Sequence, residues 1–334
     1  MTMYGEISFL LACFFIVGGL FALAWSADRF VDGAAAAAHA VGVSPFIVGM
    51  VVIGFGTCAP EFCVSVFSGA SGHAGLSLGN AYGSCIFNIA GILGISAMVA
   101  PLKVRPSLAF VGAPLLASVA AGSYFLLRDG SLRSAESWLL LVAFFLLMPL
   151  YCWFDQRSLP VTGEDASRQR QSWWKIVFDL FAGLAVMVGA SHFLVWGSVD
   201  VARALGVGEL TIGLTIVAIG TSIPELAAAV VSARKGESEL VLGNIVGSNL
   251  FNALCVVGTA GAVAGSGITG FSNYVVVRDL PVMLAASLSI SFFGANWRNP
   301  RELGRISRMA GFFWTLAFIA YMAVMLGQEV VKHG

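Results

Sequence analysis

Residues 54–61 read GFGTCAPE and residues 218–225 read AIGTSIPE, so one pattern occurs twice in this chain at a separation of 164 residues. Each copy ends on a glutamate, Glu61 or Glu225, and each glutamate lies in an otherwise apolar segment. A carboxylate within an apolar segment is costly and indicates function. These two stretches are therefore the starting point for the fold and for the site.

The similarity extends beyond the glutamates to a second stretch, LGNAYGSCIFN at 78–88 and LGNIVGSNLFN at 242–252. Residues 49–94 align with 213–258 without a gap and share 17 identities. Most identities are Gly, Pro, Ser, Asn or Glu rather than the apolar residues that any two membrane helices share. The chain therefore contains an internal repeat.

The composition is that of a membrane protein. The 334 residues are 58% hydrophobic and 11% charged, with a mean hydropathy of +0.88, whereas a soluble domain carries about 25% charged residues. Apolar runs close to the length of a membrane-spanning helix recur along the whole chain, which predicts an all-α integral membrane protein. The six cysteines lie in apolar segments without disulfide or metal spacing, so we expect them to be reduced. The N-terminus lacks a basic region before its apolar stretch and is expected to form the first span.

Ten spans are expected, and one polar linker divides them into two sets of five. The spans lie near residues 6–38, 43–70, 76–100, 108–127, 134–153, 173–204, 209–233, 239–264, 274–295 and 309–330. The domains expected from this division are a first repeat at 1–154, a cytoplasmic linker at 155–172 and a second repeat at 173–334.

Lys and Arg residues set the expected orientation, because they favour the cytoplasmic side. With the N-terminus outside, 12 of them fall in inner loops and 4 in outer loops or the tail. Both termini are therefore expected outside, in the cell (inner) membrane. Because five spans is an odd number, the second half enters the membrane from the opposite side. The fold predicted is two inverted five-helix repeats with broken helices 2 and 7, the construction of alternating-access transporters.

The breaks follow from Gly and Pro. Glycine weakens a helix, and a proline four residues later removes a donor and clashes with the preceding turn. We expect breaks at Gly56–Ala59 and Gly220–Ile223, with Pro60 and Pro224 in the first turn of a new half-helix. Carbonyls freed around 54–57 and 218–221 would face a cavity or a ligand.

Glu61 and Glu225 follow the breaks directly and would meet across the symmetry axis. A charged carboxylate near the bilayer centre costs about 3 kcal/mol or more, so two together need a cation or a proton. One Ca²⁺, or two to three Na⁺, would neutralise their formal charge, and oxygen-rich sites suit these ions. By contrast, Glu237 and Glu239 are expected in a loop and should be dispensable.

The second stretch supplies further polar groups. Ser84 and Asn88 are four residues apart and share a helical face, as do Ser248 and Asn252. Each pair offers a hydroxyl and an amide oxygen in one direction. Small residues beside them, such as Gly243, permit close helix approach.

At these residues the chain resembles the calcium/cation antiporter superfamily, specifically its prokaryotic sodium/calcium exchanger branch. The pattern G-T-x-x-P-E, followed 27 residues later by the Asn of G-S-x-x-F-N, is highly specific and occurs twice. The resemblance implies diamond-arranged sites, one for Ca²⁺ and up to three for Na⁺, occupied alternately. It implies that the long first and sixth helices slide across the rigid remainder.

The same resemblance implies roles for individual residues. The shared carboxylates would be Glu61 and Glu225. Backbone carbonyls for calcium would come from Thr57 and Thr221, and those for sodium from Gly54 and Ala218. Hydroxyl positions for sodium are matched by Ser84, Ser248 and Ser222, while the centre would be lined by Asn88 and Asn252.

Two positions depart from the family. Cys58 stands where the family usually has Ser, opposite Ser222, and Cys85 stands where the second copy keeps Asn249. A thiol is a poor ligand for Na⁺, so one sodium position is expected to be weakened. Asn252, where potassium-dependent relatives carry Asp, makes potassium co-transport unexpected.

The function predicted is a secondary antiporter, not an enzyme, that exchanges cytoplasmic Ca²⁺ for external Na⁺. A cation/proton exchanger of the same fold stays open, because two membrane glutamates can carry H⁺ as well. A passive channel is disfavoured by the buried site and the lack of a filter-like ring. A hydrolase is disfavoured because no Ser–His, His–Glu or paired-Asp constellation is found. The expected partners are Ca²⁺, Na⁺ and the lipid bilayer, with no cofactor, nucleic acid or obligate protein partner.

Overall fold

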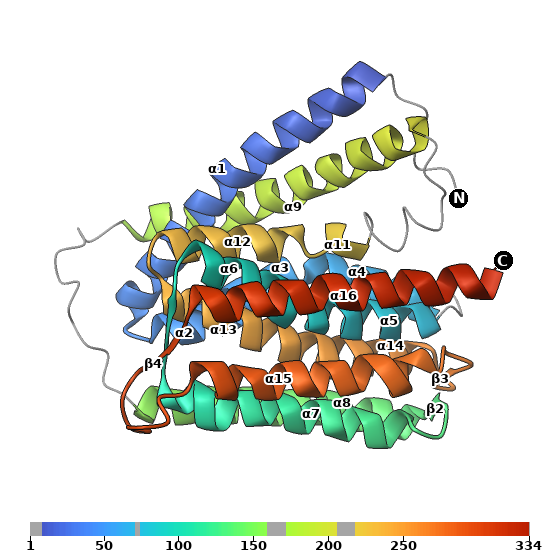
Figure 1. Ribbon diagram of the computed structural model, residues 1–334. Helices are drawn as coiled ribbons and strands as arrows, with labels where there is room; N and C mark the ends of the chain where they lie inside the picture. The colour runs from blue at the N-terminus through green and yellow to red at the C-terminus, as the bar shows by residue number, and fades with distance from the viewer. Residues whose placement is uncertain (1–8, 71–73, 159–171, 206–217, 334) are drawn as a thin grey trace.

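The computed structural model describes residues 9–70, 74–158, 172–205 and 218–333, and this part of the chain is mostly helical (Figure 1). Eight of its helices are long and apolar enough to cross a membrane. A helix pair that bends by 49° at a break passes the same test as one unit, which gives up to nine crossings in the described residues. The first half of the expected span 209–233, most of the linker and the N-terminal residues lie outside the described residues. The described part has the architecture of a multi-pass membrane protein.

The helices of the first part of the chain begin with a long helix and a broken one. They are α1 (Phe9–Val41), α2 (Pro45–Val48), the π-helical η1 (Gly49–Ile53), α3 (Gly54–Thr57) and α4 (Ala59–Ala70). The following helices are α5 (Ala74–Ile86), the π-helical η2 (Phe87–Leu93), α6 (Gly94–Val99), the π-helical η3 (Leu108–Gly112), α7 (Ala113–Leu127) and α8 (Ser134–Ser158).

The second part repeats this order. Its helices are α9 (Trp173–Ala204), α11 (Ala218–Gly220), α12 (Ile223–Arg234), α13 (Ser238–Leu250), the π-helical η5 (Phe251–Val256) and α14 (Val257–Val263). They are followed by the π-helical η6 (Val275–Asp279), α15 (Leu280–Gly294) and α16 (Arg308–His333).

Two spans form the centre of the molecule. In Ser238–Val263, 94% of the apolar stretch is buried, and in Leu76–Val99 the buried share is 78%. In the other unbroken spans of the described residues, the buried share is 22% to 44%. Around them α7 packs on α15, α8 packs on α14, and α16 packs on α6 and η2. Both halves of the broken helix also contact the centre, because α2 packs on α13 and α4 packs on α5 and α14. The second stretch of each repeat therefore lies in the core.

Gly243 and Gly247 explain how the broken helix reaches the centre. A Cβ atom at Gly243 would lie 2.1 Å from the carbonyl oxygen of Phe46, and one at Gly247 would lie 2.1 Å from that of Met50. Any side chain would push the two backbones apart. The close helix approach expected at Gly243 is therefore present, and it brings α13 against α2 and η1.

The long helices α1 and α9 pack along each other and lie over the remaining helices, sloping away from them toward one end (Figure 1). At the other end, Lys235 ties α1 to the helix that carries Glu225. Its ammonium lies 2.7 Å from Asp28 Oδ1 and 2.8 Å from Asp32 Oδ1. Sliding of α1 over α12 would have to break these contacts.

Two short antiparallel sheets join the halves at opposite ends of the molecule (Figure 1). At one end β1 (Leu102–Val104) pairs with β4 (Gly304–Ile306). At the other end β2 (Ser131–Leu132) pairs with β3 (Ile268–Thr269). Each sheet therefore takes one strand from each half.

A buried ion network lies next to β1. Arg105, only 8% exposed, bonds Glu239 Oε1 at 2.6 Å through Nε and Asp155 Oδ2 at 3.3 Å through Nη1. Ser107 donates to the other oxygen of Asp155 at 2.5 Å. Glu239 lies in the first turn of α13 and compensates a buried charge, so the expectation that it lies in a loop is wrong.

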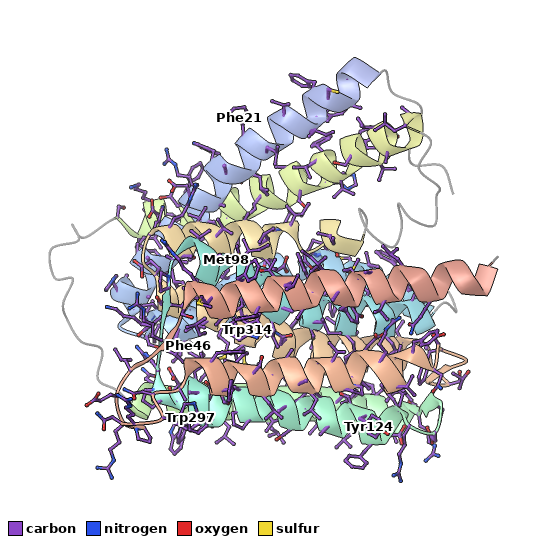
Figure 2. The ribbon with its side chains drawn as sticks, viewed as in Figure 1. Phe21, Phe46, Met98, Tyr124, Trp297 and Trp314 are labelled. Atoms are coloured by element: carbon purple, nitrogen blue, oxygen red, sulfur yellow. The ribbon has the colours of Figure 1, made fainter. Side chains whose placement is uncertain are left out.

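Apolar side chains cover the outside of the helices, as expected where they face lipid. Phe21 projects from the outer side of α1 and Tyr124 from the edge of α7, whereas Phe46 and Trp314 lie among the helices (Figure 2). Phe21 is 75% exposed and Trp314 is 4% exposed. The large exposed apolar residues thus mark the lipid-facing surface.

Candidate cation-binding site

The first helix break occurs where the sequence predicts it. Helix α3 ends at Thr57, Cys58 leaves the helical geometry with ψ of 4°, and α4 begins at Ala59. Because Pro60 has no N–H, the carbonyl of Gly56 lacks its usual helical donor. Glu61 therefore enters the first turn of a new half-helix, deep inside the protein.

The second break repeats this arrangement. Helix α11 ends at Gly220 and α12 begins at Ile223, with Pro224 at its start and Glu225 in its first turn. Here the carbonyl that proline leaves without a donor is occupied, because Ser191 of α9 donates its hydroxyl to Gly220 O at 3.0 Å.

Several carbonyls around 54–57 and 218–221, which the breaks were expected to free, accept hydrogen bonds. Besides Gly220 O, the carbonyl of Gly54 accepts hydrogen bonds from Cys58 N at 3.3 Å and from the Ser248 hydroxyl at 3.4 Å. Ile219 O accepts from Ser222 N at 3.0 Å. The carbonyl ligand expected at Gly54 would have to exchange these partners.

One half of the site, here named the Glu61 half-site, consists of Glu61, Ser222 and Ser84. Ser222 donates its hydroxyl to Glu61 Oε1 at 2.7 Å and lies 3.4 Å from the hydroxyl of Ser84. The Thr221 side chain also faces Glu61. All three members are buried, and Glu61 Oε2 has no hydrogen-bond partner in the described ranges of the chain. The acid of the first repeat is thus held by a hydroxyl of the second.

The Glu225 half-site consists of the matched residues Glu225, Cys58 and Ser248. The buried thiol of Cys58 faces both Glu225 and Ser248, and Thr57 also lies beside Glu225. Within the described part of the chain, both carboxylate oxygens of Glu225 are nevertheless left without a hydrogen bond. The charge of Glu61 acts on Glu225, so the half-sites are neighbours. The acid of the second repeat therefore lacks the hydrogen bond that its counterpart has.

Asn88 and Asn252 lie in the two matched π-helical segments. η2 packs against α12, which carries Glu225, and η5 packs against α4, which carries Glu61. Both side chains are 1% exposed, and neither amide nitrogen nor amide oxygen has a hydrogen-bond partner among the residues that the structure describes. Buried polar groups are normally satisfied, so unpartnered amides beside two acids fit a ligand-binding region. Such π-helical turns also occur frequently at functional sites.

Of the predicted site residues, the structure brings eight together through direct contacts within the half-sites. These are Glu61, Ser222, Ser84, Glu225, Cys58, Ser248, Thr57 and Gly54. Thr221 joins the Glu61 half-site, and Asn88 and Asn252 lie on the adjoining segments. Ala218 is the first residue of α11. Cys85 points to the backbone instead, with its sulfur 3.6 Å from Asn249 O.

Sequence reasoning missed two matched asparagines and one serine. Asn80 donates its amide to Glu61 O at 3.3 Å, and Asn244 donates to Glu225 O at 3.4 Å. Both belong to the repeated LGN stretch, so their identity across the repeat was a signal for them. Ser191 offered no such signal, because its counterpart Ala27 lacks a hydroxyl.

The chemistry of the site is that of hard cations. Carboxylate, hydroxyl, amide and carbonyl oxygens are the ligands of Ca²⁺ and Na⁺, whereas transition metals favour imidazole and thiolate. Within the described residues, no group of three or more His, Cys, Asp or Glu residues could hold a metal ion. Two buried acids surrounded by neutral oxygen donors can instead bind an ion weakly enough to release it.

Comparison with known proteins gives consistent results. A sequence model of the family described as sodium/calcium exchanger protein matches residues 11–154 and 175–327. A protein of Alkalimonas amylolytica, named as a candidate antiporter, CaxA, is 37% identical over 95% of this chain and 99% of its own. The sodium/calcium exchanger MaX1 of Methanosarcina acetivorans is 28% identical over 92% and 96%.

A solved structure is similar over nearly the whole chain. The sodium–calcium exchanger NCX_Mj, soaked with Na⁺ and Sr²⁺, superimposes with a TM-score of 0.80. It is 25% identical in sequence, and the match covers 95% of this chain and 99% of that one.

Proposed function

The chain belongs to the sodium/calcium exchanger protein family, and on this premise we propose that it exports Ca²⁺ from the cytoplasm in exchange for external Na⁺. The family is one of membrane transporters, so the chain is a multi-pass cation antiporter. The observation that carries the proposal is the pair of buried acids, Glu61 and Glu225, each at a helix break and each with unpartnered oxygens. MaX1 and NCX_Mj, named as sodium/calcium exchangers, support the choice of ions.

Alternating occupancy follows from charge. Two ionised carboxylates in a low-dielectric site repel each other and lose their hydration, so the unloaded site is unfavourable. One Ca²⁺ or two Na⁺ restore neutrality, and a third Na⁺ would leave the site with one positive charge. Because both loads need Glu61 and Glu225, they exclude each other. This exclusion couples the two fluxes.

We propose that the repeats are inverted, and the two small sheets support this. β1 and β3 each follow the span that carries a site asparagine, yet they lie at opposite ends of the molecule (Figure 1). Parallel repeats would place them at the same end. The helix contacts agree, since α8 packs on α14 as α16 packs on α6. Ten spans, with repeats at 1–154 and 173–334 around a cytoplasmic linker at 155–172, complete this arrangement.

The moving part of the proposed cycle is the pair α1 and α9. The helices α1 and α9 pack along each other over the broken helices, and Lys235 links α1 to α12 at one end. With both termini outside and the protein in the inner membrane, that end is cytoplasmic. Sliding of the pair across α4 and α12 would open the acids to one side and then to the other.

A second candidate function is Ca²⁺/H⁺ exchange, and Cys58 is the observation that favours it. Glu225 lacks a hydrogen bond because a thiol replaces the hydroxyl that Ser222 gives to Glu61. A buried carboxyl without hydrogen-bond donors favours its neutral, protonated form. A proton can therefore compensate the negative charge of Glu225 as well as Na⁺ can. A passive channel is not favoured, because the acids lie buried between the two halves.

The test is uptake of ⁴⁵Ca²⁺ into proteoliposomes that hold the purified full chain. An outward Na⁺ gradient alone should drive uptake, and an H⁺ gradient of the same size should drive much less. Uptake driven only by H⁺ would establish the second candidate. Uptake that follows the Ca²⁺ gradient alone, unaffected by either counter-ion, would contradict antiport.

A further inference from the structure

Asn80 and Asn244 form a matched pair that holds the backbone of the two acids. The Asn80 amide nitrogen lies 3.3 Å from Glu61 O, and the Asn244 amide nitrogen lies 3.4 Å from Glu225 O. Each asparagine reaches from a central helix, α5 or α13, to the half-helix that begins at the break. The geometry recurs in both repeats at the same sequence separation of 19 residues.

Such a contact matters because a half-helix after a break is not fixed by the helix before it. Its rotation and height decide where the first-turn carboxylate points. The carbonyl of the glutamate is bonded to the same Cα atom that carries the carboxylate side chain. A hydrogen bond from a neighbouring helix to this carbonyl therefore fixes the position of the acid without occupying its oxygens.

The second contact of each asparagine differs between the repeats. Asn80 also donates to the hydroxyl of Ser65 at 3.2 Å, and the counterpart of Ser65 is Ala229. Asn244 instead accepts from the hydroxyl of Ser248 through Oδ1 at 3.3 Å. Ser248 belongs to the Glu225 half-site and faces Cys58. Asn244 therefore contacts two parts of that half-site, whereas Asn80 contacts one part of the other.

The orientation of the Ser248 hydroxyl follows from these contacts. Its single hydrogen has two acceptors within reach, Asn244 Oδ1 at 3.3 Å and Gly54 O at 3.4 Å. Its lone pairs are then left for a donor or a cation on the other side. Without Asn244 the hydroxyl would keep only Gly54 O as an acceptor, so its direction would be less fixed.

We propose that Asn80 and Asn244 are positioning residues for the two acids and that Asn244 also orients Ser248 as a sodium ligand. This inference rests on the proposed function for the identity of the ions. Removing either asparagine should weaken Ca²⁺ binding, because Ca²⁺ needs both carboxylates in register. Removing Asn244 should weaken Na⁺ binding further, because a hydroxyl ligand is lost as well.

The experiment compares Asn80→Ala, Asn244→Ala and the control Ser65→Ala in the full-length protein. Calorimetry measures Ca²⁺ and Na⁺ binding, and thermal unfolding measures stability. Each asparagine variant should raise the Kd for Ca²⁺ by about tenfold, as loss of a group that orients a metal ligand does. The increase for Na⁺ should be about threefold larger in Asn244→Ala than in Asn80→Ala. Ser65→Ala should bind both ions as the wild type does.

A purely structural contact would behave differently. Lower unfolding temperatures with unchanged Kd values for both ions would overturn the proposal. Equal Na⁺ shifts in the two asparagine variants would overturn the part that concerns Ser248. If Asn244→Ala does not fold, Asn244→Gln keeps the amide but displaces it by one methylene, and it should shift the same constants by a smaller factor. Wild-type constants in Asn244→Gln would then overturn the proposal.

A double-mutant cycle tests the route through Ser248. The Na⁺ effects of Asn244→Ala and Ser248→Ala should not add in the double variant if one acts through the other. Additive effects would contradict that route. Failure of the proposed function has a different signature, because the wild type would then bind Ca²⁺ but show no Na⁺-driven uptake in proteoliposomes.

Discussion

The two half-sites differ by one atom at the position where they are otherwise matched. Ser222 gives Glu61 a hydrogen bond of 2.7 Å, whereas Cys58 leaves both oxygens of Glu225 without one. A hydroxyl is a strong donor and a suitable ligand for Na⁺, while a thiol is weak in both respects. The Glu61 half-site is therefore organised by the protein alone. The Glu225 half-site depends on a bound ion or proton.

This difference separates two properties, the charge of the site and the hydrogen bonding of its acids, which a symmetric site would combine. Both acids are needed for the charge of the site, so transport should be equally sensitive to them. The hydrogen bond is present on one side only, so stability and sodium affinity should not be equally sensitive. The substitutions below test the two properties in turn.

The largest effect is expected for Glu61→Gln and Glu225→Gln. Each should lower Ca²⁺ uptake by about 100-fold or more, because one carboxylate cannot compensate a divalent ion in a low-dielectric site. Glu302→Gln, in an exposed loop, is the matched control and should transport normally. Wild-type uptake by either acid variant would contradict the shared role of the carboxylates.

Unfolding of the same variants without added ions sharpens the comparison. Glu225→Gln replaces a buried acid, which must either stay charged without compensation or bind a proton, by a neutral amide, and it should raise the unfolding temperature by a few degrees. Glu61→Gln also weakens the bond from Ser222, so its gain should be smaller by about 1 kcal/mol. Equal gains would mean that the Ser222 contact does not stabilise Glu61.

The second largest effect is expected for Ser222→Cys, which makes the Glu61 half-site resemble its counterpart. Loss of a hydrogen bond to a charged group costs about 1.5–3 kcal/mol, so the Na⁺ concentration for half-maximal exchange should rise by about tenfold. Sodium-dependent Ca²⁺ uptake measures this. An unchanged sodium dependence would show that the hydroxyl of Ser222 is not used by Na⁺.

The reverse substitution, Cys58→Ser, should have a smaller and opposite effect. The new hydroxyl faces Glu225 and Ser248 and adds an oxygen donor, which should lower the half-maximal Na⁺ concentration by about threefold. It should also reduce inhibition by acid, because Glu225 no longer depends on a proton for compensation. If Cys58→Ser leaves both the sodium and the pH dependence unchanged, the thiol does not limit this half-site.

The sequence carried the information for the breaks and the acids because their causes are local. Proline removes a donor wherever it occurs in a helix, so Pro60 and Pro224 place the ends of α3 and α11 to within a few residues. A repeated glutamate in an apolar segment has few explanations other than a ligand. The repeat also restricts the packing, because both copies must bury the same stretch.

The remaining contacts depend on which helices become neighbours, which the pattern alone does not determine. Ser191 reaches Gly220 from a helix whose counterpart has alanine, and Glu239 compensates Arg105 from a helix far along the chain. Asn80 and Asn244 were visible as identities, yet their partners are backbone carbonyls, which carry no sequence signal. Side-chain identity thus predicts the charge of the site better than it predicts which side chain forms a hydrogen bond with a given backbone carbonyl.

The smallest effect is expected at the other mismatch between the repeats, Cys85 and Asn249. The Cys85 sulfur lies 3.6 Å from Asn249 O, so this thiol is used between helices rather than toward Glu225. Cys85→Ser would strengthen that contact by about 0.5–1 kcal/mol while leaving the half-maximal Na⁺ concentration within about twofold. Unfolding temperature and sodium-dependent uptake, measured together, separate the two outcomes. A sodium shift as large as that of Cys58→Ser would mean that position 85 is also a ligand position, and the difference between the half-sites would then rest on two sulfur atoms instead of one.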